Sequence, residues 1–263
     1  MRLIDSHCHL DFPNLSKDLT EHLRQATAVG VEKIIVPAVQ RQYFDQVLQL
    51  SQQYDHVYPA LGLHPLWIDR HQPQDLTDLE QIITSEHSPV VAIGEIGLDR
   101  YQPNAAQWFT QQLALLDAQF ALARQCHLPV ILHSRRTHDV LLKRLRQAAL
   151  PATGVVHGFS GSYQQAKQFI DLGYRLGMGG TITYPRANKT RHAFARLPLD
   201  CLLLETDAPD MPLFGYQGQV NCPQRVAAIF ECFCQLRVEP AALIAEQLWQ
   251  NTLALFPRLD CAI

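Results

Sequence analysis

Several features that would place a chain in a common class are missing from these 263 residues. No run of about 18 apolar residues occurs, so no segment is predicted to span a membrane. The opening Met1-Arg2-Leu3 leads directly into a short strand-like segment, from which we expect no signal peptide. No glycine-rich GxGxxG sequence follows the first predicted strand, which argues against a dinucleotide-binding fold.

Paired cysteines are also missing. The seven cysteines are scattered, their number is odd, and no CxxC sequence occurs. Cys232 and Cys234 lie two residues apart in a predicted helix and would not share a face, so we expect no thiolate metal site there. Reduced, mostly buried thiols are typical of a reducing compartment, and we therefore expect a cytoplasmic protein.

An excess of basic residues is absent as well. The chain has 22 Lys and Arg against 25 Asp and Glu, and its formal net charge is −3. A protein that coats DNA without sequence preference usually has a strongly basic face. An anionic substrate would therefore be held locally, by metal ions or by a few arginines.

Short apolar runs alternate with longer helix-like segments along the chain. Strands are predicted at 2–7, 33–38, 57–64, 90–97, 129–134, 153–159, 174–180 and 201–206. Helices are predicted at 16–28, 42–53, 75–84, 105–126, 137–149, 163–172, 189–197, 222–236 and 240–255. About eight such units predict an α/β fold, a (β/α)8 TIM barrel that forms a single domain over 1–263. The alternative is a doubly wound open sheet.

Two histidines flank a cysteine in the opening RLIDSHCHLDFP. Because side chains alternate along a strand, His7 and His9 would point to one face and Cys8 to the other. Two imidazoles on one side can hold one metal ion, whereas the alternative is a strand end with two ordinary histidines. The pair alone does not decide between them, because short motifs match by chance.

Chemically active side chains recur where the predicted strands end. They are His7 and His9, His64, Glu95, His133, His157 and Asp207. In a barrel the carboxyl ends of all strands meet at one mouth, where active sites are built. Imidazole and carboxylate groups are ligands of divalent metals. The sequence therefore predicts a metal centre whose ligands are His7, His9, Glu95, His133, His157 and Asp207.

Six protein ligands suggest two ions, because a catalytic zinc usually takes about three plus water. A carboxylate can bridge two cations and a neutral imidazole does not readily do so, which makes Glu95 the expected bridge. The expected ligand sets are His7, His9, Glu95 and Asp207 for one ion, and Glu95, His133 and His157 for the other. Two divalent ions about 4 Å apart would activate a water and clamp the attacked group. The sequence does not choose among Zn, Mn and Mg.

The segments DSHCHLD, GLHP, GEIGLD, LPVILHSR, HGFSG, LLLETDAP and QNTLALF follow one another in this order. They resemble the pattern of the TatD family of metal-dependent deoxyribonucleases, which belongs to the wider amidohydrolase-like barrels. The resemblance covers nearly the whole chain and implies a (β/α)8 fold, a centre of two divalent metals and phosphodiester hydrolysis with 3′→5′ exonuclease action. It also implies that the six predicted ligands are the family's metal ligands and that His64 lies near the substrate phosphate.

Three stretches depart from the family pattern. Leu66 stands in GLHPLW where members often have histidine, and HGFSG stands for HCFSG. The sequence DMPLFGYQGQVNCP replaces a different loop that carries NEP. These positions surround the pocket, so we expect metal binding to be intact while the identity of the substrate stays open.

Further residues beside the predicted ligands suit supporting roles. Asp207 is predicted to be catalytic, as a ligand that also accepts a proton from the water, with ligation alone as the alternative. Arg135 and Arg136 suit bidentate phosphate contacts, although one of them is expected to face solvent. Glu205 would either orient a ligand histidine or form a buried ion pair with an arginine. Asp99 would also lie next to a ligand.

Aromatic residues in the predicted mouth loops have two interpretations. Phe159, Trp67 and Tyr101 would either stack nucleic-acid bases or pack within the loops. The weak basic balance favours a small or single-stranded substrate end over a long duplex.

The leading hypothesis is a metal-dependent nuclease that acts on DNA or RNA ends, preferably single-stranded, without a membrane or an obligate protein partner. The alternative is a barrel hydrolase of another bond, an aminoacyl ester, lactone or amide. A non-catalytic binding protein with a structural metal is the third hypothesis. The full ligand set argues against it, because structural sites are usually closed by four ligands.

Overall fold

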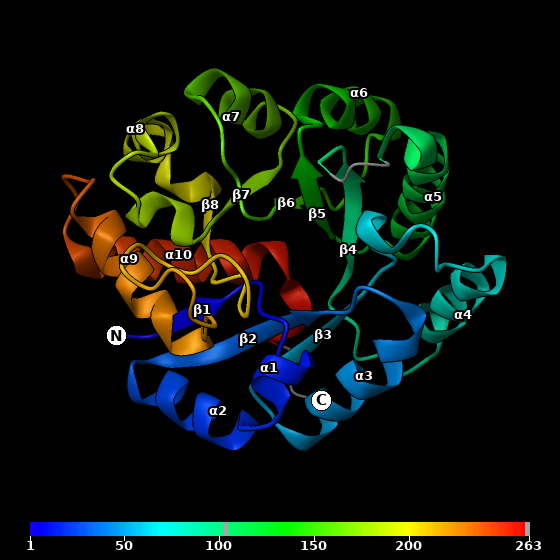
Figure 1. Cartoon of the computed structure of the whole chain (residues 1–263), viewed down its shortest axis with the longest axis horizontal. Helices are drawn as coiled ribbons and strands as arrows, with labels where there is room; N and C mark the ends of the chain where they lie inside the picture. The colour runs from blue at the N-terminus through cyan, green and yellow to red at the C-terminus, as the bar shows by residue number, and fades with distance from the viewer. Residues whose placement is uncertain (102–104, 261–263) are drawn as a thin grey trace. The chain divides into compact units, whose positions relative to one another are not determined.

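The computed structural model describes residues 1–101 and 105–260. Strands and helices alternate along this chain, and the sheet order runs from β1 to β8 without a crossover. The strand pairs are parallel. This is the strand order of a (β/α)8 barrel, as predicted, because a doubly wound sheet reverses its order at a switch point (Figure 1).

The strands are β1 (Leu3–Asp5), β2 (Val31–Pro37), β3 (Val57–Leu61), β4 (Ala92–Asp99), β5 (Val130–Arg135), β6 (Gly154–Val156), β7 (Arg175–Met178) and β8 (Leu202–Leu204). The helices are α1 (Pro13–Ser16), α2 (Leu19–Ala28), α3 (Phe44–Gln53), α4 (Pro73–Thr84), α5 (Ala105–Cys126), α6 (His138–Ala148), α7 (Tyr163–Ile170), α8 (Asn188–Arg196), α9 (Val226–Cys234) and α10 (Ala241–Leu255). Each predicted segment has its counterpart, but most strands are shorter than predicted.

The strands are shorter because their last residues leave the hydrogen-bonded ladder and enter loops. His7 and His9 therefore lie beyond β1, which ends at Asp5, and not at the end of a strand as predicted. Glu95 and His133 differ, since they lie within β4 and β5. The sequence prediction was wrong about these boundaries.

The chain contains two compact units, which are described separately. The first unit comprises 1–36 and 157–254, and the second comprises 37–156 and the segment from Leu255 onward. In the first unit β1 pairs with β2 and β7 with β8. In the second unit β4 pairs with β3 on one side and with β5 on the other, and β5 also pairs with β6.

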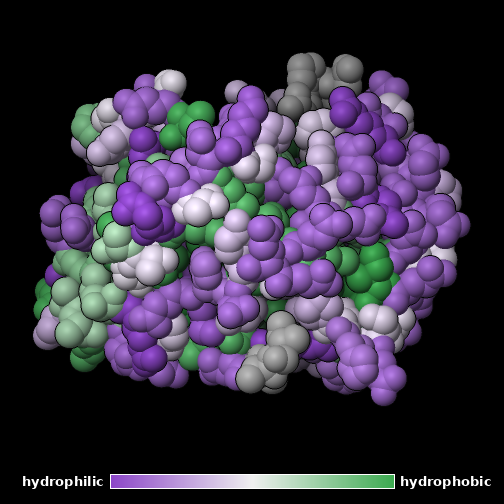
Figure 2. Space-filling view, turned by 90° about the horizontal axis from the view of Figure 1, so that it is seen from below, coloured by the Kyte–Doolittle hydropathy of each residue, from purple (hydrophilic) through white to green (hydrophobic). Residues whose placement is uncertain are grey.

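Both units bury the apolar runs that predicted their strands. All eight residues of β4 are buried, as expected for a parallel strand covered on both faces. Phe194 and Phe233 are fully buried in the first unit. The face of the molecule in Figure 2 is largely hydrophilic, with hydrophobic residues in smaller groups between polar ones. None of the helices in the described ranges combines the length and the apolar character needed to cross a membrane.

A glycine is required where β4 runs beside β5. Gly97 has φ +145°, and a Cβ atom there would overlap the carbonyl oxygen of His133. Only glycine allows this close approach of the two backbones. The GEIG sequence therefore has a structural cause, since Gly97 lets the strand that carries Glu95 lie against the strand that carries His133.

Arg237 closes the end of α8. Its guanidinium donates hydrogen bonds to the carbonyl oxygens of Phe194, Ala195 and Leu197 at 3.2, 3.2 and 2.7 Å. It also donates from Nε to Glu239 at 3.0 Å. The last carbonyls of a helix have no partner within the helix, so this side chain supplies one.

We expect the Arg237→Met substitution to lower the free energy of unfolding by about 1–3 kcal/mol, because it leaves buried carbonyl groups without a donor. Urea denaturation measures this change. Arg24→Met is the matched control, since Arg24 forms an exposed ion pair on α2 and should change stability by less than about 1 kcal/mol. Equal effects of the two substitutions would refute this role of Arg237.

Candidate metal centre

Four side chains that follow β1, β6 and β8 meet in the first unit. We call His7, His9, His157 and Asp207 the first cluster. Nε2 of His7 lies 3.2 Å from Nε2 of His9 and 3.4 Å from Oδ1 of Asp207. The same Asp207 oxygen lies 3.6 Å from Nε2 of His9 and 4.0 Å from Nδ1 of His157. All four residues are buried.

Backbone pairing beyond the strand ends positions the first cluster. The Asp207 amide donates to the His7 carbonyl at 2.8 Å, and the His9 amide donates to the Ala208 carbonyl at 2.7 Å. Asp207 has φ +55°, in the left-handed region that aspartate tolerates better than most residues. Cys8 pairs with Ala208 and is fully buried, and this burial raises the pKa of its thiol well above the ordinary value. Cys8 is therefore packed behind the cluster, as expected.

Burial opposes ionisation of Asp207, but the hydrogen bond with His9 and the charges of His157 and His7 outweigh it. The pKa of Asp207 is therefore held below its ordinary value. An ionised carboxylate facing three imidazoles supplies the negative charge that a divalent cation requires.

Asp5 supports this cluster, and the sequence analysis did not identify it. Its carboxylate accepts hydrogen bonds from the Thr206 amide at 2.9 Å and the Thr206 hydroxyl at 2.6 Å. It also accepts one from the His7 amide at 3.3 Å. Burial raises the pKa of Asp5 to about 7. The sequence did contain a signal for this role, since Asp5 is an acidic residue within a predicted buried strand. Buried charged groups need partners.

Glu205 supports the loop that follows His157. Its Oε1 accepts a hydrogen bond from the amide of Gly158, the residue after His157. Burial raises the pKa of Glu205 to about 8. A Cβ atom at Gly177 would overlap this carboxyl group, so the glycine makes room for Glu205. Within residues 1–101 and 105–260 no arginine pairs with it, which favours the positioning interpretation over the ion pair.

A second cluster lies in the second unit and comprises His64, Glu95, His133 and Asp99. Oε1 of Glu95 is 2.9 Å from Nε2 of His64 and 3.1 Å from Nδ1 of His133. Nδ1 of His64 accepts a hydrogen bond from the Leu66 amide at 3.1 Å. A neutral His64 therefore carries its hydrogen on Nε2 and donates it to Glu95.

Asp99 sets the orientation of His133. Its Oδ2 lies 2.9 Å from Nε2 of His133, so this nitrogen donates and leaves the lone pair of Nδ1 directed toward Glu95. Burial opposes ionisation of Asp99, but the hydrogen bonds from His133 and the Tyr101 amide lower its pKa. The side chain of Gln112 bonds both the amide and the carbonyl of Asp99. Such carboxylate–histidine pairs fix the tautomer of metal-binding histidines.

The spacing of the nitrogen and oxygen ligand atoms in the two clusters suits divalent metal ions. A ligand atom lies about 2.1 Å from zinc, so two ligands at a tetrahedral angle lie about 3.4 Å apart. In the first cluster the contacts among His7, His9 and Asp207 span 3.2–3.6 Å. Close groups of ligand atoms occur at His7–His157–Asp207 and at His64–Glu95–His133. Nitrogen and carboxylate donors of this kind suit Zn and Mn, and carboxylates also suit Mg.

The Asp99→Ala substitution is expected to weaken metal binding by about 10- to 100-fold, because His133 loses the partner that fixes its tautomer. Competition with a metal-sensitive dye measures this affinity. The Asp117→Ala substitution on α5 is the control, since Asp117 forms a half-exposed ion pair with Arg144. Unchanged affinity in the Asp99 variant would show that Asp99 does not support a metal ligand.

The predicted substrate residues lie beside acidic and aromatic side chains. His64, predicted near the substrate phosphate, contacts Glu95 and belongs to a possible metal-binding group. Arg135 is exposed, and its guanidinium lies 3.4 Å from the centre of the Tyr101 ring. Arg136 lies 4.8 Å from the same ring. Both guanidinium groups therefore lie near the Tyr101 ring, which is exposed.

The base-stacking interpretation of Phe159 was wrong. The ring is 2% exposed and packs edge-on against Phe169 and Phe194. Sequence alone does not separate an aromatic residue in a loop from one that turns into the core. Trp67 is half-buried, with the Arg70 guanidinium 4.6 Å from its ring centre.

The model of a family described as TatD related DNase matches residues 4–257. An uncharacterized metal-dependent hydrolase of Escherichia coli K12, YjjV, is 54% identical, and the alignment covers 97% of this chain and 98% of that protein. Its crystal structure, described as that of a TatD homologue, superposes with a TM-score of 0.95 over 97% of this chain and 98% of that one.

More distant relatives include one human and one further bacterial protein. Human deoxyribonuclease TATDN3 is 31% identical, with 98% of this chain and 95% of that protein covered. An uncharacterized metal-dependent hydrolase of Haemophilus influenzae is 45% identical, with 97% and 100% covered.

Proposed function

Because the chain belongs to the TatD-related DNase family and is a metal-dependent hydrolase, we propose that it is a nuclease acting on nucleic-acid ends. The proposed reaction is 3′→5′ hydrolysis of phosphodiester bonds, preferably in single strands. The observation that supports this most is the first cluster, in which an ionised carboxylate faces three imidazoles. The name of the human relative adds support, since that protein is called a deoxyribonuclease.

We also propose that the chain binds two divalent ions through the ligands that the sequence predicts. The carboxyl ends of barrel strands share one mouth, and Glu95 would bridge the ions with its two oxygens. The proposed ligands are His7, His9, Glu95, His133, His157 and Asp207. Zn, Mn or Mg, when bound, would generate the attacking nucleophile from water and offset charge on the phosphate.

The side chains themselves have further proposed roles. Asp207 is ionised at neutral pH, because its pKa is held below the ordinary value, and can accept the proton that the attacking water loses. His64 donates a hydrogen bond to Glu95 and thereby orients the proposed bridge. The His64 ring is also proposed to lie near the substrate phosphate. Arg135 would bind the phosphate, with the Tyr101 ring limiting where its guanidinium can lie.

The proposed compartment is the cytoplasm, because the six cysteines of the described residues are free thiols. No obligate partner protein is part of the proposal. A single-stranded end suits a chain whose net charge is −3, since a long duplex would require a broad basic surface.

The experiment uses metal-stripped protein resupplied with Mg, Mn or Zn. Single-stranded DNA and RNA oligonucleotides labelled at either end are the substrates, and denaturing gels resolve the products. We expect a metal-dependent ladder that shortens from the 3′ end. If no metal yields cleavage although metal binds tightly, the nuclease proposal fails, and aminoacyl esters, lactones and amides become the substrates to test.

A further inference from the structure

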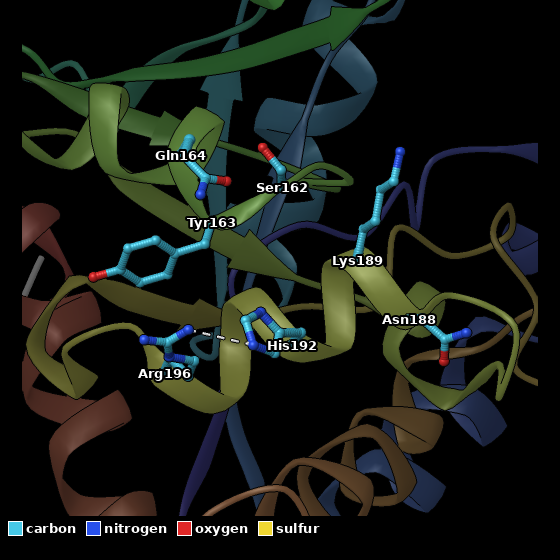
Figure 3. A pocket seen from close by; sticks show the side chains of 7 residues that line it. All are labelled: Ser162, Tyr163, Gln164, Asn188, Lys189, His192 and Arg196. Atoms are coloured by element: carbon cyan, nitrogen blue, oxygen red, sulfur yellow. Dashed lines mark hydrogen bonds between the residues drawn. The ribbon is translucent and has the colours of Figure 1, made fainter.

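A pocket of about 500 Å³ lies between the start of α7 and α8, within the first unit. It is lined by Ser162, Tyr163, Gln164, Asn188, Lys189, His192 and Arg196 (Figure 3). None of these residues was part of the predicted site. The residues at the start of α7 lie on one side of the pocket and the α8 residues on the other, so these two helices form it together.

The pocket lies in an unusually basic part of an otherwise slightly acidic chain. Residues 172–199 contain five Lys and Arg and no Asp or Glu, although the whole chain has a net charge of −3. Lys189, His192 and Arg196 are spaced by three and four residues and therefore share one face of α8. This face carries a local positive charge that the composition of the whole chain conceals.

These cations are available to a ligand. Lys189 and Arg196 are exposed, and no carboxylate among residues 1–101 and 105–260 pairs with either of them. The Arg196 guanidinium lies 5.3 Å from the centre of the Tyr163 ring and 3.4 Å from Nε2 of His192. An aromatic ring next to exposed cations is the combination that single-strand binders use, because the ring stacks on a base and the cations meet phosphates.

The pocket is close to the first cluster along the chain. Ser162 follows His157 by five residues, so their Cα atoms are at most about 17 Å apart. The loop between them is held to α8, since the Gly161 amide donates to the Thr190 hydroxyl at 3.2 Å and the Ser160 hydroxyl lies 3.3 Å from it. One strand of a duplex has a phosphate about every 3.4 Å, so the distance from His157 to Ser162, at the edge of the pocket, corresponds to no more than about five nucleotides.

We propose that this pocket binds the backbone of a single-stranded nucleic acid a few nucleotides from the bond that is cut. Lys189 and Arg196 contact phosphate oxygens, and Tyr163 offers its ring to a base. This inference rests on the proposed nuclease function and names its substrate class, a strand of several nucleotides and not a small phosphate ester. The pocket thereby lets a slightly acidic protein bind a polyanion at one basic site.

The test measures binding separately from cleavage. Full-length protein with the Asp207→Asn substitution, supplied with Mn, is titrated with a fluorescent 12-nucleotide single strand, so that the strand stays intact. Adding the Lys189→Ala and Arg196→Ala substitutions should weaken binding about 10-fold and reduce the slope of log K against log salt by about 1.4, which is about 0.7 for each lost phosphate contact. The Lys143→Ala, Arg146→Ala pair on α6 removes the same charge outside the pocket and should change neither quantity.

Substrate length provides the second readout. In the otherwise wild-type enzyme, the Lys189/Arg196 pair of substitutions should raise KM for the 12-nucleotide strand about 10-fold and leave KM for a dinucleotide unchanged. Equal binding by the two double variants, or no binding of the strand by the parent protein, would overturn the inference. Competition by a mononucleotide as strong as that by the strand would overturn it too, since the pocket would then hold single phosphates. If the strand binds through Lys189 and Arg196 but is not cleaved, the binding role of the pocket is supported. The proposed nuclease function is then refuted.

Discussion

The Asp207→Asn substitution is expected to lower kcat/KM by on the order of 10³-fold or more while the protein stays folded. Asparagine has the shape of aspartate but no negative charge, so His7, His9 and His157 would face an amide in place of a carboxylate. A neutral side chain neither offsets the charge of a metal ion nor accepts the proton of the attacking water. Initial rates on an end-labelled oligonucleotide measure the loss, and circular dichroism with a thermal melt checks the fold.

Asp200→Asn is the matched control for this prediction. Asp200 is exposed, and the substitution removes the same charge from the same unit without touching the cluster. We expect its activity to equal that of the wild type. Activity retained by the Asp207 variant would contradict both its catalytic role and its role as a ligand.

The Glu95→Gln substitution is expected to have a loss of similar size, also on the order of 10³-fold in kcat/KM. Glu95 is 2% exposed, and its Oε1 contacts both His64 and His133. Glutamine would place an amide against the two imidazoles and would bridge two cations poorly. The number of ions retained after dialysis should therefore fall along with the activity.

Two further variants make the Glu95 result decisive. Glu95→Asp keeps the charge on a shorter side chain and should recover part of the metal binding, even if the glutamine variant is unstable. Glu80→Gln on the exposed side of α4 is the control and should behave as the wild type. Full activity of Glu95→Gln with two retained ions would show that Glu95 is not the bridge.

The sequence predicts the order of elements well, because buried parallel strands appear as continuous apolar runs. The run 90–97 became β4, all of whose residues are buried. Strand ends were predicted less well. Whether a residue is apolar or polar does not show where the backbone hydrogen bonds between neighbouring strands stop. The predicted strand 2–7 ends at Asp5, whose carboxylate binds the His7 and Thr206 amides that follow β1 and β8.

The candidate ligands were visible in the sequence because histidines and acids at successive strand ends are an unusual pattern. Their supporting contacts were less visible. The role of Gly177 depends on Glu205, 28 residues later, and no local motif connects the two. The hydrogen on Nε2 of His64 follows from the Leu66 amide, which the sequence does not orient.

The basic pocket was missed for another reason. Net charge averages over the whole chain, and the value of −3 hides the absence of acids in 172–199. Lys189 and Arg196 line a pocket only because α8 faces the start of α7, which also carries Tyr163. Such a surface depends on the packing of two helices, which periodicity does not predict.

The central claim is that the predicted ligands of this chain bind two divalent ions, and counting those ions tests it most directly. Metal-stripped protein would be titrated with Mn or Zn by calorimetry, and the ions retained after dialysis would be counted by elemental analysis. We predict two ions per chain in the wild type and fewer in the Asp207→Asn and Glu95→Gln variants. A limit of one ion per chain, unchanged by either substitution, would contradict the account.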